Sequence, residues 1–185
     1  MDVATVLASL ESSALATTIR NSLYLFPLIE SVHVLGLTMV FGTIAIIDLR
    51  LLGLASTRRP FSAVASDVLK WTWLAFAVTV TTGVLMFITG AGGYYRNPYF
   101  RVKMALLAVS GLNMLMFELT ARRTLAKWDT DAAAPAIGKA VAALSLVVWI
   151  GVIFMGRWVG FAPASAPLPA EDEINLEELE NLLPK

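Results

Sequence analysis

The sequence predicts an all-α integral membrane protein, a four-helix bundle whose spans run up-down-up-down. Its 185 residues are 57% hydrophobic and only 15% charged, whereas soluble domains carry about a quarter charged residues. Four apolar stretches approach the roughly 20 residues that a helix needs to cross about 30 Å of hydrocarbon. The three connections between these stretches are short and polar and contain Pro or Gly, which favours antiparallel neighbours.

The four spans form an expected transmembrane domain, 22–162, and lie at about 23–47, 68–88, 102–121 and 139–161. Before them, residues 1–21 carry apolar side chains at helical spacing, which predicts one or two short amphipathic helices in the membrane interface. After them, 163–185 pass from a Pro/Ala-rich linker into an acidic tail with a leucine face. That tail is interpreted either as a solvated segment or as a docking helix for a protein partner or a second copy.

The orientation of the bundle follows from the basic residues near the span ends. Eight flank the first and third connections, namely Arg50, Arg58, Arg59, Lys70, Arg122, Arg123, Lys127 and Lys139. Five flank the other side, namely Arg20, Arg96, Arg101, Lys103 and Arg157. The bias predicts that both termini lie outside the cytoplasm. Because the N-terminus lacks the features of a cleaved signal peptide, the first span is expected to act as its own insertion signal.

Composition excludes several classes of function. The chain has no cysteine, which rules out disulfides, thiolate metal sites and thiol catalysis. Its formal net charge is zero and no large basic patch is present, so nucleic acid is not an expected partner. The glycine-rich run at 89–93 lacks the Lys-Ser/Thr pair of a phosphate loop. With one histidine in the chain, no Ser-His-Asp set is defensible.

The first span carries Glu30 and the single histidine, His33, about 10 to 15 Å below the expected outer boundary. Ionisable groups at such a depth are costly and mark candidate functional sites. Their spacing of three places them on one helix face and matches the Glu-x-x-His motif of di-iron bundles. A di-iron site needs a second such motif, so it is excluded within one chain and is not expected between two chains. A mononuclear metal bound by His33, Glu30 and further oxygens, or a haem b with His33 as axial ligand, remains open.

Other polar groups are expected at a similar depth. They are Thr79, Thr81 and Thr82 on the second span, Ser110 and Asn113 on the third, and Trp149 and Arg157 on the fourth. Arg157 is long enough to reach and neutralise Glu30, and His33 can hydrogen-bond a threonine or Asn113. The candidate binding residues are therefore His33, Glu30, Asn113, Arg157 and Trp149. Four interpretations stay open: a structural polar layer, a haem or other redox cofactor, a metal, and a proton or substrate relay.

A second charged layer is expected at the opposite ends of the spans. It comprises Asp48, Arg50, Asp67, Lys70, Glu118, Arg122 and Lys139. Opposite charges on adjacent helix ends favour interfacial pairing that fixes helix register, because interfacial charges reach water at little cost.

Three stretches together resemble an uncharacterised family of bacterial four-span membrane proteins over roughly residues 20–162. They are ESVHVLGLTMVFGTIAIIDLRLLG at 30–53, NPYFRVK at 97–103 with Asn113 beyond it, and WIGVIFMGRWVGF at 149–161. The resemblance implies the four-span fold and a bacterial inner-membrane location. The chain is also distantly similar to copper-resistance-D-like and cytochrome-b561-like membrane bundles, in which helix histidines ligate metal or haem. It departs from them by having one histidine.

Two functions are expected from these observations. The first is a non-enzymatic inner-membrane subunit or anchor that binds haem, quinone or a metal near His33 and serves a periplasmic redox or metal-handling partner. The alternative is a small transporter or proton- or ion-coupled carrier that uses Glu30, His33 and Arg157. Four spans are few for a carrier, so it would act as a homo-oligomer, for which the G-x-x-x-G pair Gly156 and Gly160 offers a packing surface.

Overall fold

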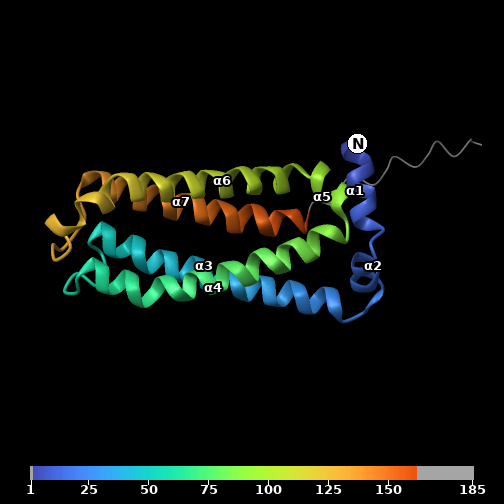
Figure 1. Cartoon of the computed structure of the whole chain (residues 1–185), viewed down its shortest axis with the longest axis horizontal. Coiled ribbons are helices and arrows are strands. Elements are labelled where there is room, and N and C mark those ends of the chain that lie inside the picture. The colour runs from blue at the N-terminus through green and yellow to red at the C-terminus, as the bar shows by residue number, and fades with distance from the viewer. Residues whose placement is uncertain (1, 162–185) are drawn as a thin grey trace, which may run out of the picture.

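The computed structural model describes residues 2–161, and within this range every regular element is a helix (Figure 1). Four helices are long and apolar enough to cross a membrane: α3 (Leu25–Leu52), α4 (Phe61–Ile88), α6 (Pro98–Leu119) and α7 (Ala136–Val159). The shorter elements are α1 (Val3–Glu11), α2 (Ala14–Asn21), α5 (Ala91–Arg96) and the 3₁₀ helix η1 (Ala121–Lys127). The all-α four-span prediction is confirmed. The predicted linker and acidic tail, 163–185, lie outside the described residues.

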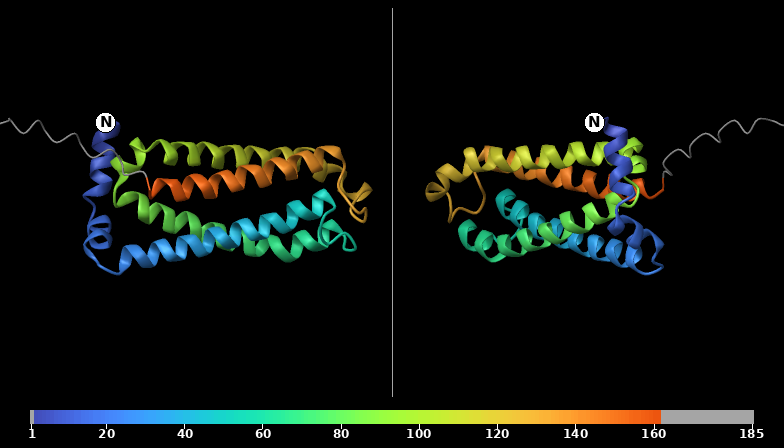
Figure 2. Two further views of the ribbon diagram at one scale, coloured as in Figure 1. Left: turned by 180° about the vertical axis from the view of Figure 1, so that it is seen from behind. Right: turned by 45° about the vertical axis from the view of Figure 1, so that its right-hand side comes forward.

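The four long helices form two antiparallel pairs. Helix α3 packs along α4, α6 packs along α7, and α7 joins the pairs by lying against α3. The views in Figures 1 and 2 show both pairs side by side, with α1 and α2 lying across one end of the bundle. We call this the terminal end, because the chain starts and the described part of α7 finishes there. The opposite end, formed by the connections at 53–60 and 120–135, is the loop end.

The helix bounds are set by local capping rather than by hydropathy. Helix α3 continues past the expected residue 47 to Leu52 and stops at Gly53, whose left-handed φ of 77° is a conformation that favours glycine. Helix α4 starts at Phe61, directly after Pro60 and seven residues before the expected start at 68. Helix α6 starts at Pro98, because the Asn97 side chain accepts hydrogen bonds from the backbone N–H groups of Tyr99 and Phe100.

Two short helices cover the terminal end. Ser13 separates them and caps α2 by accepting a hydrogen bond from the Ala16 N–H at 3.3 Å. The Glu11 carboxylate accepts a hydrogen bond from the Gly92 N–H at 2.7 Å, and Arg20 donates to the Thr89 carbonyl at 3.0 Å. These bonds fix the N-terminal helices to α5 and to the end of α4. Their expected position in the membrane interface stays a prediction.

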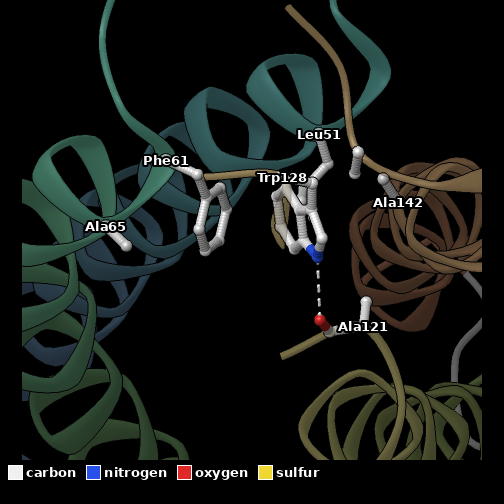
Figure 3. Close-up of a cluster of buried hydrophobic side chains, with 7 residues drawn as sticks. Leu51, Phe61, Ala65, Ala121, Trp128 and Ala142 are labelled. Atoms are coloured by element: carbon white, nitrogen blue, oxygen red, sulfur yellow. Dashed lines mark hydrogen bonds between the residues drawn. The ribbon is translucent and has the colours of Figure 1, made fainter. Parts of the chain in front are cut away.

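A cluster of buried apolar side chains holds the loop end together (Figure 3). This loop-end cluster consists of Leu51, Phe61, Ala65, Ala121, Trp128, Ala134 and Ala142. The Trp128 indole N–H donates to the Ala121 carbonyl at 3.1 Å, and its ring lies 5.3 Å from that of Phe61 between centroids. The indole therefore buries its apolar surface without leaving its one donor unsatisfied.

A second apolar cluster occupies the middle of the bundle. This central cluster consists of Val40, Ala75, Trp149 and Val152, with Ile44 and Leu106 among the half-buried side chains packed on it. Nearby, α3 and α4 approach closely at Gly36, where a Cβ would lie 2.5 Å from the Thr79 hydroxyl. Any larger residue at position 36 would force the Thr79 side chain to move, so glycine allows the two helices to lie this close.

Candidate functional site

Buried and half-buried polar groups form two layers, one on each side of the central cluster. The terminal polar layer contains His33 and Lys103 with Thr79 and Thr82, and the loop polar layer contains Asp48, Asn113 and Ser145. Except for Thr82, each member stands about one helical turn from an apolar side chain that belongs to a cluster or packs on one. Thus Ser145 is four residues from Trp149, and Thr79 is four residues from Ala75. Along the bundle, apolar and polar layers alternate.

The position of the His33 ring is set by α4. Its Nδ1 atom lies 3.0 Å from the Thr79 carbonyl oxygen and 3.0 Å from the Thr82 hydroxyl. A carbonyl can only accept, so Nδ1 carries the proton and donates. The Thr82 hydroxyl donates to the Val78 carbonyl at 2.8 Å, which leaves its oxygen free to accept from His33. The expected threonine contact of His33 is confirmed, and the remaining ring atom, Nε2, keeps a lone pair.

Two glycines make room for the two basic side chains of this layer. A Cβ on Gly83 would lie 3.1 Å from Cε1 of His33, and a Cβ on Gly156 would lie 3.6 Å from Nζ of Lys103. Each basic side chain therefore rests on the backbone of the helix paired with its own. Both side chains are half-buried, and the Lys103 ammonium lies near enough to His33 to act on the ring electrostatically.

Lys103 is the site residue that sequence reasoning missed, because it was counted only among the flanking charges. A signal was present. Leu106 and Leu107 follow it at the i+3 and i+4 positions, and both pack on the central cluster. Residues at those spacings share a helix face, so Lys103 belongs to the interior face of α6.

Glu30 and Arg157 are not brought together. Glu30 is exposed on α3, where its charge acts on Tyr94 of α5. Arg157 is exposed at the end of α7, with its guanidinium 4.6 Å from the centre of the Phe161 ring. Across residues 2–161 the ion pairs are Arg59–Asp67 and Arg122–Glu118. The expected Glu30–Arg157 pair does not form because the interior face of α7 carries Gly156, and Arg157 is turned about 100° from it.

Asn113 and Trp149 lie away from His33. Asn113 was expected at the depth of His33, but it is bonded to the Val141 carbonyl near the loop end, at 3.0 Å. The reason is the early start of α6 at Pro98, which puts Asn113 about 22 Å along the helix while His33 is about 12 Å along α3. Trp149 is buried in the central cluster, which makes it a packing residue between the two polar layers.

The loop end differs from the predicted interfacial charge layer. Glu118 and Arg122 form the expected i,i+4 pair, and Asp67 pairs with Arg59. Asp48 and Arg50 were expected at the interface, but they are 5% and 0% exposed. The Arg50 guanidinium donates hydrogen bonds to four backbone carbonyls, those of Arg59, Asp129, Asp131 and Ala132. Loop carbonyls, rather than water, solvate this charge.

The metal interpretation gains no further ligands from the fold. In the part of the chain that the structure describes, no group of three or more His, Asp or Glu side chains is placed to hold a metal ion. His33 and Glu30 remain the two residues predicted for such a site, and the fold places the positive charge of Lys103 where it acts on the His33 ring.

Comparison with known proteins gives a family and no activity. The chain matches no curated protein and no solved structure. The distant similarity to copper-resistance-D-like and cytochrome-b561-like bundles stays a prediction. One family model, described as a family of unknown function, matches residues 17–162. This match covers all four long apolar helices and both polar layers, and the protein therefore belongs to the DUF6644 family, a family of unknown function.

Proposed function

We propose that the protein is a non-enzymatic membrane subunit that binds a quinone in its terminal polar layer and serves a separate redox partner. The observation that carries this proposal is that the terminal polar layer holds two basic side chains, the hydrogen-bonded ring of His33 and the ammonium of Lys103, whose charge acts on that ring. The Nδ1–H of His33 is committed to the Thr79 carbonyl at 3.0 Å, so Nε2 can accept a hydrogen bond from a quinol hydroxyl. The Lys103 ammonium supplies the complementary donor for a quinone carbonyl.

A quinone fits this layer better than a metal or a haem. Lys103 acts on His33 with a positive charge, which opposes the binding of a second cation at the ring. The only histidine of the chain supplies one axial ligand, whereas a six-coordinate haem takes a second one from a Met or from another copy. A quinone needs no such ligand. It also reaches the site from the hydrocarbon phase, the environment expected for these spans.

The carrier function is supported less well by the same geometry. His33 and Asp48 are the ionisable groups of α3 in the two polar layers, and fifteen residues, or about 22 Å, separate them. The central cluster fills this interval with Val40 and Val152, which are 1% and 0% exposed. An apolar layer of that kind breaks a proton or ion path through one bundle. An ion or proton flux into proteoliposomes that the wild type supports and that His33→Ala or Glu30→Gln abolishes would favour the carrier function instead.

The test of quinone binding uses the full chain purified in a mild detergent. The absorption spectrum and metal content are recorded first, and a solvent extract is analysed for ubiquinone and menaquinone. The depleted protein is then titrated with decylubiquinone. We expect no haem absorption band, co-purified quinone in the extract, and a dissociation constant that rises about tenfold in His33→Gln, which corresponds to one lost hydrogen bond.

Two outcomes separate this proposal from its competitors. Ser31→Ala is the matched control, because Ser31 is exposed on the same helix and donates only to the Pro27 carbonyl. It should bind decylubiquinone as the wild type does. Equal affinities of His33→Gln and wild type, or a haem band that disappears in His33→Gln, would overturn the quinone proposal. The predicted partner contact through 171–185 is tested separately by truncation.

A further inference from the structure

The loop polar layer contains two buried oxygens that lack partners. Oδ2 of Asp48 and Oδ1 of Asn113 have no hydrogen-bond partner among the described residues, although both residues are only 5% exposed. The orientation of the Asn113 amide is fixed, because its Nδ2 donates to the Val141 carbonyl at 3.0 Å and a carbonyl can only accept. Its Oδ1 is therefore a free acceptor. Burying an acceptor without a hydrogen-bond donor costs free energy, and burying a carboxylate without a partner costs more.

The residues that carry these two oxygens both contact the same part of α7. The Ser145 hydroxyl lies within hydrogen-bonding reach of the Asp48 carboxylate. Asn113 is anchored on Val141, which precedes Ser145 by four residues and so stands on the same face of α7 one turn away. The three side chains come from α3, α6 and α7. They thus form a small set of oxygens built from three different helices.

Apolar layers seal this set on both sides. On one side lies the loop-end cluster. Leu51 and Ala142, three residues from Asp48 and Ser145 respectively, belong to this cluster, and Phe117, four residues from Asn113, packs against it. On the other side of the set lies the central cluster. Trp149, four residues after Ser145, belongs to this cluster, and Ile44, four residues before Asp48, packs on it. Water has little access to such a site, so an ionised Asp48 carboxylate needs a positive charge nearby to balance it.

Arg50 does not supply that charge by direct pairing. Its guanidinium is directed to carbonyls of the loops, including that of Asp131 at 2.9 Å. In residues 2–161 no ion pair involves Asp48. Arg50, two residues along α3, is thus already committed to the loop carbonyls, and the Asp48 carboxylate has only neutral oxygen groups around it in a dry environment.

We propose that Asp48, Asn113 and Ser145 form a buried binding site for a monovalent cation of the size of sodium. One carboxylate balances one positive charge. A divalent cation such as calcium or magnesium, which proteins bind through several charged oxygens or retained waters, would keep an uncompensated positive charge in this dry environment. The described residues also contain no cluster of His or carboxylate ligands for a transition metal. The oxygens without partners, Oδ2 of Asp48 and Oδ1 of Asn113, are ligand atoms in this site, and the Ser145 hydroxyl is a third.

Thermal unfolding of the full chain in detergent tests the site. Sodium chloride replaces choline chloride at constant ionic strength, with lithium and potassium chloride as parallel series. We expect sodium to raise the midpoint of the wild type by about 5–10 °C at a hundredfold excess over the dissociation constant. Asp48→Asn removes the charge with almost unchanged shape and should abolish the shift. Ser145→Ala should move the half-saturating sodium concentration upward about tenfold.

Asp67→Asn provides the matched control, since Asp67 is an exposed carboxylate whose ion pair is with Arg59. It should keep the full sodium response. Equal midpoints in sodium, potassium and choline, or a sodium shift that survives in Asp48→Asn, overturn the proposal. Should Asp48→Asn fail to fold, equilibrium binding of ²²Na⁺ to the wild type decides, and the absence of saturable binding overturns it. Greater stability of Asp48→Asn without any sodium response identifies a permanently protonated acid instead.

Discussion

Each half of the bundle holds a basic side chain in its interior, and the two differ in how many of their N–H donors form hydrogen bonds. At the loop end, Arg50 is 0% exposed and donates four hydrogen bonds to backbone carbonyls, which uses four of its five N–H donors. In the terminal half, Lys103 is half-buried, lies on Gly156 and has no ion pair within residues 2–161. A fully satisfied charge stabilises the fold, whereas a charge with unused donors is available to a ligand. Substitutions at the two ends should therefore have different consequences.

The largest effect is expected at Arg50. Arg50→Ala removes the guanidinium donor from the carbonyls of Arg59, Asp129, Asp131 and Ala132. The loss of these four hydrogen bonds weakens the contact between the two loops, so we expect the free energy of unfolding to fall by about 3–5 kcal/mol. Arg50→Lys should recover only part of the lost unfolding free energy, because one ammonium group cannot reach all four carbonyls that the planar guanidinium contacts. Chemical unfolding in detergent, followed by near-UV circular dichroism, measures both. Arg59→Ala, which removes an exposed ion pair, should cost less than about 1 kcal/mol.

Gly53 comes next at the same end. Its φ of 77° is left-handed, and a Cβ there would lie 2.7 Å from the Ala133 Cβ and 3.1 Å from the Ala132 carbonyl. Gly53→Ala should therefore lower the free energy of unfolding by about 2–3 kcal/mol, of which about 1–2 come from the backbone conformation. Gly42→Ala is the control on the same helix. No atom lies within 4 Å of a Cβ there, so the melting temperature should stay equal or rise slightly.

The predictable part of the molecule is the part encoded locally. Hydropathy located four spans, and the short connections gave their antiparallel order. The Glu-x-x-His spacing drew attention to His33, and its threonine partners on α4 follow from matching depths. These inferences need only the periodicity of one or two helices.

The unpredictable part depends on long-range contacts. Asp48 and Arg50 were assigned to the interface because charges usually reach water there. The carbonyls that accept hydrogen bonds from Arg50 lie up to 82 residues further along the chain, and no local sequence pattern predicts these contacts. The depth of Asn113 was misjudged because the cap formed by Asn97 starts α6 earlier than hydropathy indicates. Lys103 was missed for the related reason that a charge near a span end usually marks topology.

At the terminal end, Gly83→Ala should affect ligand binding more than stability. Its Cβ would meet Cε1 of His33 at 3.1 Å, so the imidazole has to shift by a few tenths of an ångström and its hydrogen bond to Thr79 weakens. We expect about a tenfold loss of decylubiquinone affinity, equivalent to about 1.4 kcal/mol, with a small change in melting temperature. Gly111→Ala has no atom within 4 Å of the new Cβ and should leave both quantities unchanged. Equal affinities in the two variants would break the contrast between the ends.

The smallest effect belongs to Asp129, a surface element of the loop end. Its carboxylate accepts hydrogen bonds from the backbone N–H and the hydroxyl of Ser62, each at 2.7 Å, and so caps the first turn of α4. Asp129→Ala should cost about 1 kcal/mol, the usual contribution of a helix cap. These bonds, first that of the backbone N–H and then that of the hydroxyl, hold the pKa of Asp129 below its ordinary value of 3.8.

The depressed pKa fixes the sign of the pH dependence. Because the folded protein binds this proton less readily than the unfolded chain does, the cap contributes its full stabilisation above pH 3.8 and loses it as the pH falls through the lower, folded-state pKa. The difference in unfolding free energy between wild type and Asp129→Ala should therefore stay constant from pH 7 to about pH 5 and shrink below pH 4. Decylubiquinone affinity should not differ between the two proteins at pH 7. A change in that affinity would couple the loop end to the terminal layer across the central cluster, which would require the bundle to respond as one unit.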